Sequence, residues 1–195
     1  MFENLLGRIS RQLRLAKIPY MVIGGQAVLL YGEPRLTKDI DITLGVGIEA
    51  FEKIKSMVSQ LGLTVLSEDP EKFVRETMVL PLADPRSGIR IDLIFSSFPY
   101  ERQALKRARR VKLGNSSICF ASLEDVVIHK IIAGRPRDLE DIKGMLMRNP
   151  ACDRKYVAKW LKEFDQALGR NFLRLFERIT KGLGQTKRIR GKGKR

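Results

Sequence analysis

The sequence predicts a mixed α/β fold of the α+β kind, in which a sheet with helices is followed by an all-helical C-terminal part. Apolar and polar residues alternate with period two only before residue 121, which indicates strands in that half. Two such runs, at 77–83 and 89–95, flank the turn-forming residues 84–88 and predict a β-hairpin. From Ser122 onward apolar residues recur every three or four positions, which predicts helices alone.

The elements of the first half follow from the same periodicities. We expect helices over 2–13, 26–31, 48–62, 70–75 and 101–110, and strands over 20–23, 39–44 and 63–66, together with the hairpin and a strand pair over 111–121. In the second half Ser122 and Asp125 form a capping box before a helix over 126–133. A second helix is expected over 137–147, a third after a cap at Asp153, and a fourth from Phe172.

Length and charge set the domain organisation. The 195 residues, 44% of them hydrophobic, are enough for one folded domain with an appendage. We expect an α/β core over 1–121, a helical subdomain over 122–183 and a flexible basic tail over 184–195. The net charge of +15 indicates either a polyanionic partner or a basic tail that aids solubility.

Several classes of protein are excluded. No run of about 18 apolar residues is present, so no membrane span is expected, and the N-terminus lacks the pattern of a signal peptide. Cys119, Cys152 and His129 are too few for a zinc cluster or a disulfide framework. We therefore expect a protein of the reducing cytoplasm with no membrane partner.

Three aspartates are the first candidate site. Asp39 and Asp41 alternate with isoleucines, so both point to one face of their strand, and Asp92 has the same place in the strand over 89–95. If the two strands are neighbours, three carboxylates meet on one face, and such an all-oxygen set suits Mg²⁺ and a nucleotide triphosphate. The alternative is that these aspartates only lie on a solvated sheet face.

The residues around the aspartates resemble a known family. The string Gly24-Gly25-Gln26, then Gly32-x-x-Arg35-x-Thr37-x-Asp39-x-Asp41, then a later strand with Asp92, resembles the nucleotidyltransferase superfamily of DNA polymerase β. Its small AbiEii-like members, of the abortive-infection toxin type, are the most similar. In the helical half Lys130 and the run Arg137-Asp138-x-x-Asp141 resemble a second signature of that group. The resemblance covers residues 20–143.

This resemblance implies a polymerase-β-like core and a phosphoryl-transfer site. Asp39 and Asp41 would hold Mg²⁺ or Mn²⁺, and Asp92 would share the metal or take the proton of the attacking hydroxyl. Nucleotide-binding candidates are the residues of the glycine loop, the following loop and the second signature: Gly24, Gly25, Gln26, Arg35, Thr37, Arg137, Asp138 and Asp141. Lys130 would pair with the triphosphate. Family members commonly carry Ser or Thr where this chain has Gln26, so a hydroxyl contact to phosphate is lost or replaced by an amide.

For several of these residues a purely structural role, without contact to a nucleotide, is an alternative. Lys130 could extend its charged end from an apolar helix face, and Arg35 could be a solvated loop residue. Asp138 and Asp141 have the spacing of ordinary helix-start acids and ion pairs, or they could orient Lys130. His129 has the place of a packing residue. The basic run over 106–112 is either a solvated face or an RNA-binding surface.

The function that follows is a metal-dependent nucleotidyltransferase that moves an NMP from an NTP to a hydroxyl of RNA, with tRNA as one candidate, or of a protein. The resemblance also implies a toxin, an antitoxin or a phage-defence role with a partner protein. The rival function is a nucleic-acid-binding protein on a catalytically degenerate scaffold. Intact Asp39, Asp41 and Asp92 disfavour this rival, because a pure binder gains nothing from like charges held together.

Overall fold

A computed structural model describes residues 2–96 and 98–192, with the side chains of those up to residue 183. Two compact units are present. The first, called the α/β unit, comprises Met1–Ala27 and Leu36–Ser122, and the second, called the helical unit, comprises Val28–Arg35 and Leu123–Arg195. The short segment Val28–Arg35 thus groups with the helical unit, although it falls inside the range expected for the α/β core.

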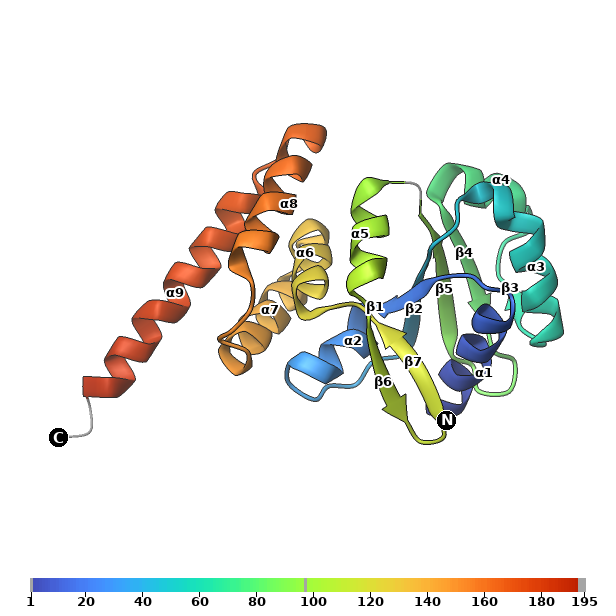
Figure 1. The fold of residues 1–195 in the computed structure, drawn as a ribbon, viewed down its shortest axis with the longest axis horizontal. Helices are drawn as coiled ribbons and strands as arrows, with labels where there is room; N and C mark the ends of the chain where they lie inside the picture. The colour runs from blue at the N-terminus through green and yellow to red at the C-terminus, as the bar shows by residue number, and fades with distance from the viewer. Residues whose placement is uncertain (1, 97, 193–195) are drawn as a thin grey trace. The chain divides into compact units, whose positions relative to one another are not determined.

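The α/β unit is built on one mixed sheet of seven strands in the order β3-β4-β5-β2-β1-β7-β6 (Figure 1). Its strands are β1 (Tyr20–Ile23), β2 (Asp39–Leu44), β3 (Thr64–Val65), β4 (Val79–Ala83), β5 (Arg90–Phe95), β6 (Arg109–Leu113) and β7 (Ser116–Phe120). β2 pairs with β5 in parallel and with β1 in antiparallel fashion. The mixed α/β class predicted from the sequence is therefore confirmed.

Apolar side chains that alternate along the strands form the core of this unit. Ile40, Ile42 and Ile91 are fully buried, whereas the polar residues between them reach the opposite face. The hairpin of β4 and β5 is closed by the predicted turn, in which the Gly88 N–H donates to the Asp84 carbonyl at 2.8 Å. The helices of this unit are α1 (Phe2–Leu15), α3 (Phe51–Gln60), α4 (Pro70–Thr77) and α5 (Pro99–Arg107), with a 3-10 turn over Ile48–Ala50.

One element differs from its prediction. The sequence predicts a basic helix over 101–110, but α5 ends at Arg107 and β6 begins at Arg109. Ala108 has extended dihedral angles, with φ −55° and ψ 135°, which turn the chain out of the helix. Val111 then pairs with Ile118 of β7 in a hairpin around Gly114, whose φ is +52°. Pairing with a partner strand decides this segment, because the basic residues alone favour neither structure.

The helical unit contains α6 (Leu123–Ala133), α7 (Pro136–Arg148), α8 (Arg154–Leu168) and α9 (Phe172–Lys192). Helix α2 (Gly24–Tyr31) begins in the α/β unit and ends in this one. The predicted cap of α8 is confirmed, because the Asp153 side chain accepts a hydrogen bond from the Tyr156 N–H. Among the described residues, none of the helices combines the length and the apolar composition that a membrane-spanning segment requires.

The basic tail expected over 184–195 is largely outside the described residues. The backbone of α9 continues to Lys192, while residues 193–195 and all side chains from 184 onward are not described. The flexible tail stays a prediction.

Candidate active site

Strands β2 and β5 bring two of the predicted carboxylates together. They run parallel, and Asp41 lies directly opposite Asp92 in the register, while Asp39 lies opposite Arg90. All four of these polar residues fall on one face, since the intervening Ile40 and Ile91 are fully buried in the core. The condition that the sequence set for the three carboxylates to share a face, namely that the two strands are neighbours, is met.

Gly24 makes room for one of these carboxylates. It opens α2 directly after β1, with φ at +63°, a left-handed conformation that side chains other than glycine adopt at a cost. A Cβ atom at this position would lie 1.9 Å from Oδ2 of Asp41. The Asp41 carboxylate therefore occupies the space that a side chain would fill at the start of α2. The first N–H groups of a helix lack partners within it and favour an anion there.

Arg90 partly neutralises the negative charge of the face that carries the aspartates. Arg90 Nε lies 3.2 Å from Oδ1 of Asp92, and the Asp92 side chain is 22% exposed. Asp39 lies exposed at the start of β2. Among the residues that the structure describes, no three acidic, His or Cys side chains gather closely enough to hold a metal ion by themselves. Within the described residues, Asp39, Asp41 and Asp92 thus share a face without forming a closed metal-binding cluster.

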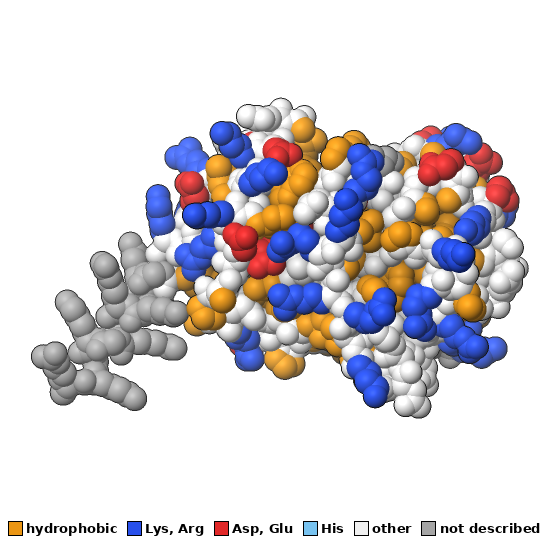
Figure 2. All heavy atoms as spheres, viewed as in Figure 1, with side chains coloured by type: hydrophobic (Ala, Val, Ile, Leu, Met, Phe, Trp, Pro, Cys, Tyr) orange, Lys and Arg blue, Asp and Glu red, His pale blue; other side chains and the backbone are white. Residues whose placement is uncertain are grey.

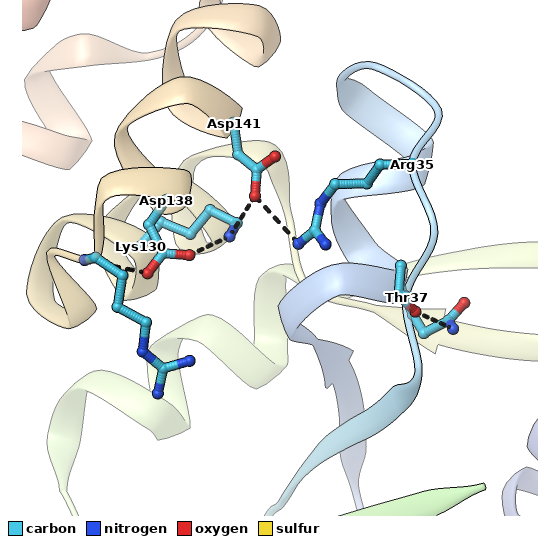
Figure 3. A network of polar contacts seen from close by, with 7 residues as sticks. Arg35, Thr37, Lys130, Asp138 and Asp141 are labelled. Atoms are coloured by element: carbon cyan, nitrogen blue, oxygen red, sulfur yellow. Dashed lines mark hydrogen bonds and ion pairs between the residues drawn. The ribbon is translucent and has the colours of Figure 1, made fainter.

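Two further predicted residues form a pair beside the glycine loop. Gln26, in the first turn of α2, donates a hydrogen bond from Nε2 to Thr37 Oγ1 at 2.6 Å (Figure 3). Gly25 lies next to Gln26, and Thr37 lies two residues before Asp39. The pair thus ties the loop before β2 to the start of α2.

The second signature forms an ion-pair cluster within the helical unit. Lys130 Nζ on α6 lies 2.6 Å from Asp138 Oδ1 and 2.7 Å from Asp141 Oδ2, both on α7 (Figure 3). Arg35 joins the same Asp141 oxygen at 3.1 Å, and the Arg135 N–H donates to Asp138 Oδ2. Lys130 is only 7% exposed at its side chain, so it does not extend into solvent from an apolar face.

Two cations and two carboxylates in this cluster balance each other. The alternative that Arg35 is a solvated loop residue is wrong, because its guanidinium is paired with Asp141 and its side chain is only 20% exposed. Asp138 and Asp141 hold Lys130, which is one of the two roles that the sequence left open for them. Arg137 lies exposed on the first turn of α7 and takes no part in the cluster.

Residues that the sequence did not single out as a site hold α8 in the helical unit. The buried Glu124 accepts a hydrogen bond from the Asp153 N–H at 3.0 Å, and the buried Asp125 accepts one from Tyr156 Oη at 2.9 Å. Burial lowers the pKa of His129, on the same helix, to about 4, which keeps its imidazole neutral near pH 7. His129 thus adds no positive charge beside Lys130.

Comparison with known proteins identifies the family. The model of a family described as nucleotidyltransferase of unknown function (DUF6036) matches residues 3–170. A sequence comparison with curated proteins finds no match. The AbiEii-like subtype stays a prediction.

Solved structures share the fold at low identity. The antibiotic-resistance factor ANT(2'')-Ia has a TM-score of 0.61 and 14% identity, over 86% of this chain and 94% of its own. An antigenic nucleotidyltransferase-like protein from Paracoccidioides brasiliensis has a TM-score of 0.53 and 17% identity, over 86% and 88%. The lincosamide antibiotic adenylyltransferase LnuA, solved with lincomycin bound, has a TM-score of 0.51 and 17% identity, over 73% and 94%. The chain belongs to the DUF6036 family of nucleotidyltransferases and is an enzyme that transfers nucleotidyl groups.

Proposed function

We propose that this enzyme transfers an NMP from an NTP to an acceptor hydroxyl on RNA, with Mg²⁺ or Mn²⁺ as cofactor. The observation that carries the proposal is the register of Asp41 opposite Asp92 on neighbouring strands, beside the glycine-led start of α2. A carboxylate pair and a row of backbone donors are the two parts that bind a metal ion and a triphosphate.

The residues present fit a divalent cation. Asp39, Asp41 and Asp92 offer only hard oxygen atoms, the ligands that Mg²⁺ prefers. Asp41 reaches the helix start through the space left by Gly24, which no larger residue would leave free. We assign Asp39 and Asp41 as its ligands, with Asp92 on the shared face. When bound, the ion would neutralise the carboxylates and the triphosphate and polarise the reacting phosphate.

The residues of the chain carry the other parts of the reaction. The backbone N–H groups of Gly24 and Gly25 bind phosphate oxygens at the start of α2. The acceptor hydroxyl oxygen forms a bond to the α-phosphorus, the bond from that phosphorus to the bridging oxygen breaks, and pyrophosphate leaves. Asp92 takes the proton of the acceptor hydroxyl. The rate gain comes from positioning and charge neutralisation, as in other phosphoryl transfers.

The role of Lys130 in binding the triphosphate also stays a proposal. Asp138 and Asp141 neutralise its charge, so a phosphate would have to compete with two carboxylates for the ammonium. Arg35, Arg137, Asp138 and Asp141 are proposed as nucleotide-binding residues through this cluster and the start of α7.

The choice of RNA rests on a basic surface of the α/β unit, made of Lys106 on α5 and Arg109, Arg110 and Lys112 on β6. All four are exposed, and none makes an ion pair in the part of the chain that the structure describes. In Figure 2, blue side chains gather over the places where Figure 1 draws α5 and β6. On an edge strand, Arg110 and Lys112 point to the same side about 7 Å apart, close to the repeat of phosphates along a nucleic-acid strand.

The test of the reaction uses each labelled NTP with Mn²⁺ or Mg²⁺ and total RNA. Label should move to RNA with the wild-type protein and not with Asp41→Asn. Asp69→Asn is the matched control, because it removes the same charge from the cap of α4 while asparagine still caps a helix. Absence of transfer to any acceptor would sink the proposal. Label found on protein and not on RNA would contradict the choice of RNA as the acceptor, but it would support the transfer reaction.

The test of the acceptor surface is the salt dependence of RNA binding. Each of Arg110→Gln and Lys112→Gln should reduce the slope of log K against log salt by about 0.7, as expected for one lost phosphate contact to a single strand. Lys72→Gln on α4, an exposed lysine away from this surface, is the control. Equal slopes for all three variants would contradict the assignment of this surface.

A toxin–antitoxin or phage-defence role is proposed on the resemblance to AbiEii-like enzymes. An antitoxin of this kind would modify a hydroxyl of its toxin instead of RNA. A neighbouring gene that encodes a small helical ribonuclease would support the antitoxin role, and growth arrest on expression of the enzyme alone would support the toxin role.

A further inference from the structure

The hydrogen bond between Gln26 and Thr37 fixes the orientation of a hydroxyl beside the glycine loop. Gln26 Nε2 donates to Thr37 Oγ1 at 2.6 Å, and both residues are half-buried (Figure 3). A hydroxyl has one proton to donate and two lone pairs that accept. Since Thr37 accepts from the amide, its own proton is left for a different acceptor.

No carboxylate or carbonyl takes that proton within the described residues. In that part of the chain, the only hydrogen bond of Thr37 is the one from Gln26. A hydroxyl that accepts one hydrogen bond is polarised to donate another, and charged acceptors receive the strongest ones. The Thr37 hydroxyl is thus oriented to donate a hydrogen bond, and none of the described residues accepts it.

The position of this donor suits a phosphate. Through Gln26 it is tied to the first turn of α2, where Gly24 and Gly25 present backbone N–H groups. Thr37 also precedes Asp39, a proposed metal ligand, by two residues. At the same helix start, the carboxylate of Asp41, the other proposed metal ligand, takes the space that a Cβ at Gly24 would fill.

We propose that Thr37 donates its hydroxyl proton to the triphosphate and that Gln26 is a positioning residue that holds this hydroxyl. The inference rests on the proposed function. It explains why the residue after the glycine pair is a glutamine here instead of the hydroxyl residue that the sequence motif leads one to expect. The hydroxyl is still present, but it comes from the loop eleven residues further on and is oriented by the glutamine amide.

The experiment measures binding of inorganic tripolyphosphate with Mg²⁺ by calorimetry, which needs no nucleobase and no turnover. Thr37→Val keeps the shape and loses the hydroxyl, and should weaken binding about 10-fold, as expected for a hydrogen bond to a charged group. Thr37→Ser should rescue most of that loss. Gln26→Ala should weaken binding by less, and should add little in the Thr37→Val background, because it acts through Thr37.

Thr77→Val is the matched control, since the exposed Thr77 hydroxyl bonds to Phe73 in α4 and to Val79, the first residue of β4. Circular dichroism confirms that each variant is folded. Thr37→Val binding as tightly as the wild type would overturn the assignment, and so would a larger loss in Gln26→Ala than in Thr37→Val. If the wild-type protein does not bind tripolyphosphate at all, this result would instead contradict the proposed function.

Discussion

Asp41 on β2 and Asp92 on β5 lie directly opposite each other in a parallel register, and Arg90 holds Asp92 at 3.2 Å. Like charges at opposed positions of a sheet destabilise it, so the fold gives up stability at this pair. A protein keeps such a pair where a cation or a substrate is to be bound. Arg90 also places a positive charge beside Asp92 on the face where the proposed cation would bind, and the two positive charges repel each other.

Arg90→Gln should therefore increase the affinity for Mg²⁺. An exposed ion pair contributes about 0.2–1 kcal/mol, so the gain in affinity should be at most about fivefold. Calorimetric titration of Mg²⁺ in the presence of an NTP measures it. Weaker Mg²⁺ binding by Arg90→Gln would show that Arg90 supports the site instead of competing for it.

Gly24→Ala should abolish nucleotidyl transfer, because the new Cβ would collide with the Asp41 carboxylate. A displacement of about 1 Å can reduce a rate about 100-fold. Gly88→Ala is a close control: Gly88 has a φ of +67° and open space around its Cβ position. Both variants should lose about 1–2 kcal/mol of unfolding free energy to backbone strain, and only Gly24→Ala should lose activity. Equal activities of the two would contradict the role given to Gly24.

Lys130→Met should strongly destabilise the helical unit, because it leaves Asp138 and Asp141 without their shared ammonium group. Removal of one partner from a buried ion pair costs about 3–5 kcal/mol. Neutralising the acids as well, in Lys130→Met with Asp138→Asn and Asp141→Asn, should recover a large part of that loss. Urea unfolding measures both, and a triple variant less stable than Lys130→Met would contradict the account.

Acid should destabilise the protein partly through His129. Its pKa is about 4 in the fold and near 6.5 when unfolded, so the unfolded chain binds the proton first. The stability from neutral His129 is complete above pH 6.5 and declines toward pH 4, by at most about 3 kcal/mol. Unfolding free energies of the wild type and His129→Gln should therefore converge or cross over this range. Parallel pH profiles would show that His129 does not titrate in this way.

Local patterns in the sequence predict a large part of the fold. The alternation of Asp39, Asp41 and Asp92 with apolar residues places each carboxylate on one face of its own strand, and those apolar residues are buried as expected. The hairpin turn over 84–88 and the cap at Asp153 are local as well, since each depends on neighbours a few positions away. Such features are decided by residues that are close in the chain.

Pairings between distant residues are the part that the sequence does not show. The strand pair expected over 111–121 begins two residues earlier than predicted, because Arg109 pairs with Phe120 and Arg110 with Cys119 of β7. Arg35 meets Asp141 more than a hundred positions later in the chain, and no periodicity marks that contact. The hydrogen bond between Gln26 and Thr37 cannot be predicted from the sequence either, because a side-chain hydrogen bond of this kind forms only once the backbone is folded.

The face with Asp41 and Asp92 is proposed here as a metal-dependent nucleotide site. Its most direct test is Mn²⁺ binding by electron paramagnetic resonance, with an NTP present, in the wild type, Asp41→Asn and Asp69→Asn. We predict that the wild type and Asp69→Asn bind Mn²⁺ and that Asp41→Asn loses at least 10-fold in affinity, or about 1.4 kcal/mol. Equal Mn²⁺ affinity in the wild type and Asp41→Asn would contradict the account.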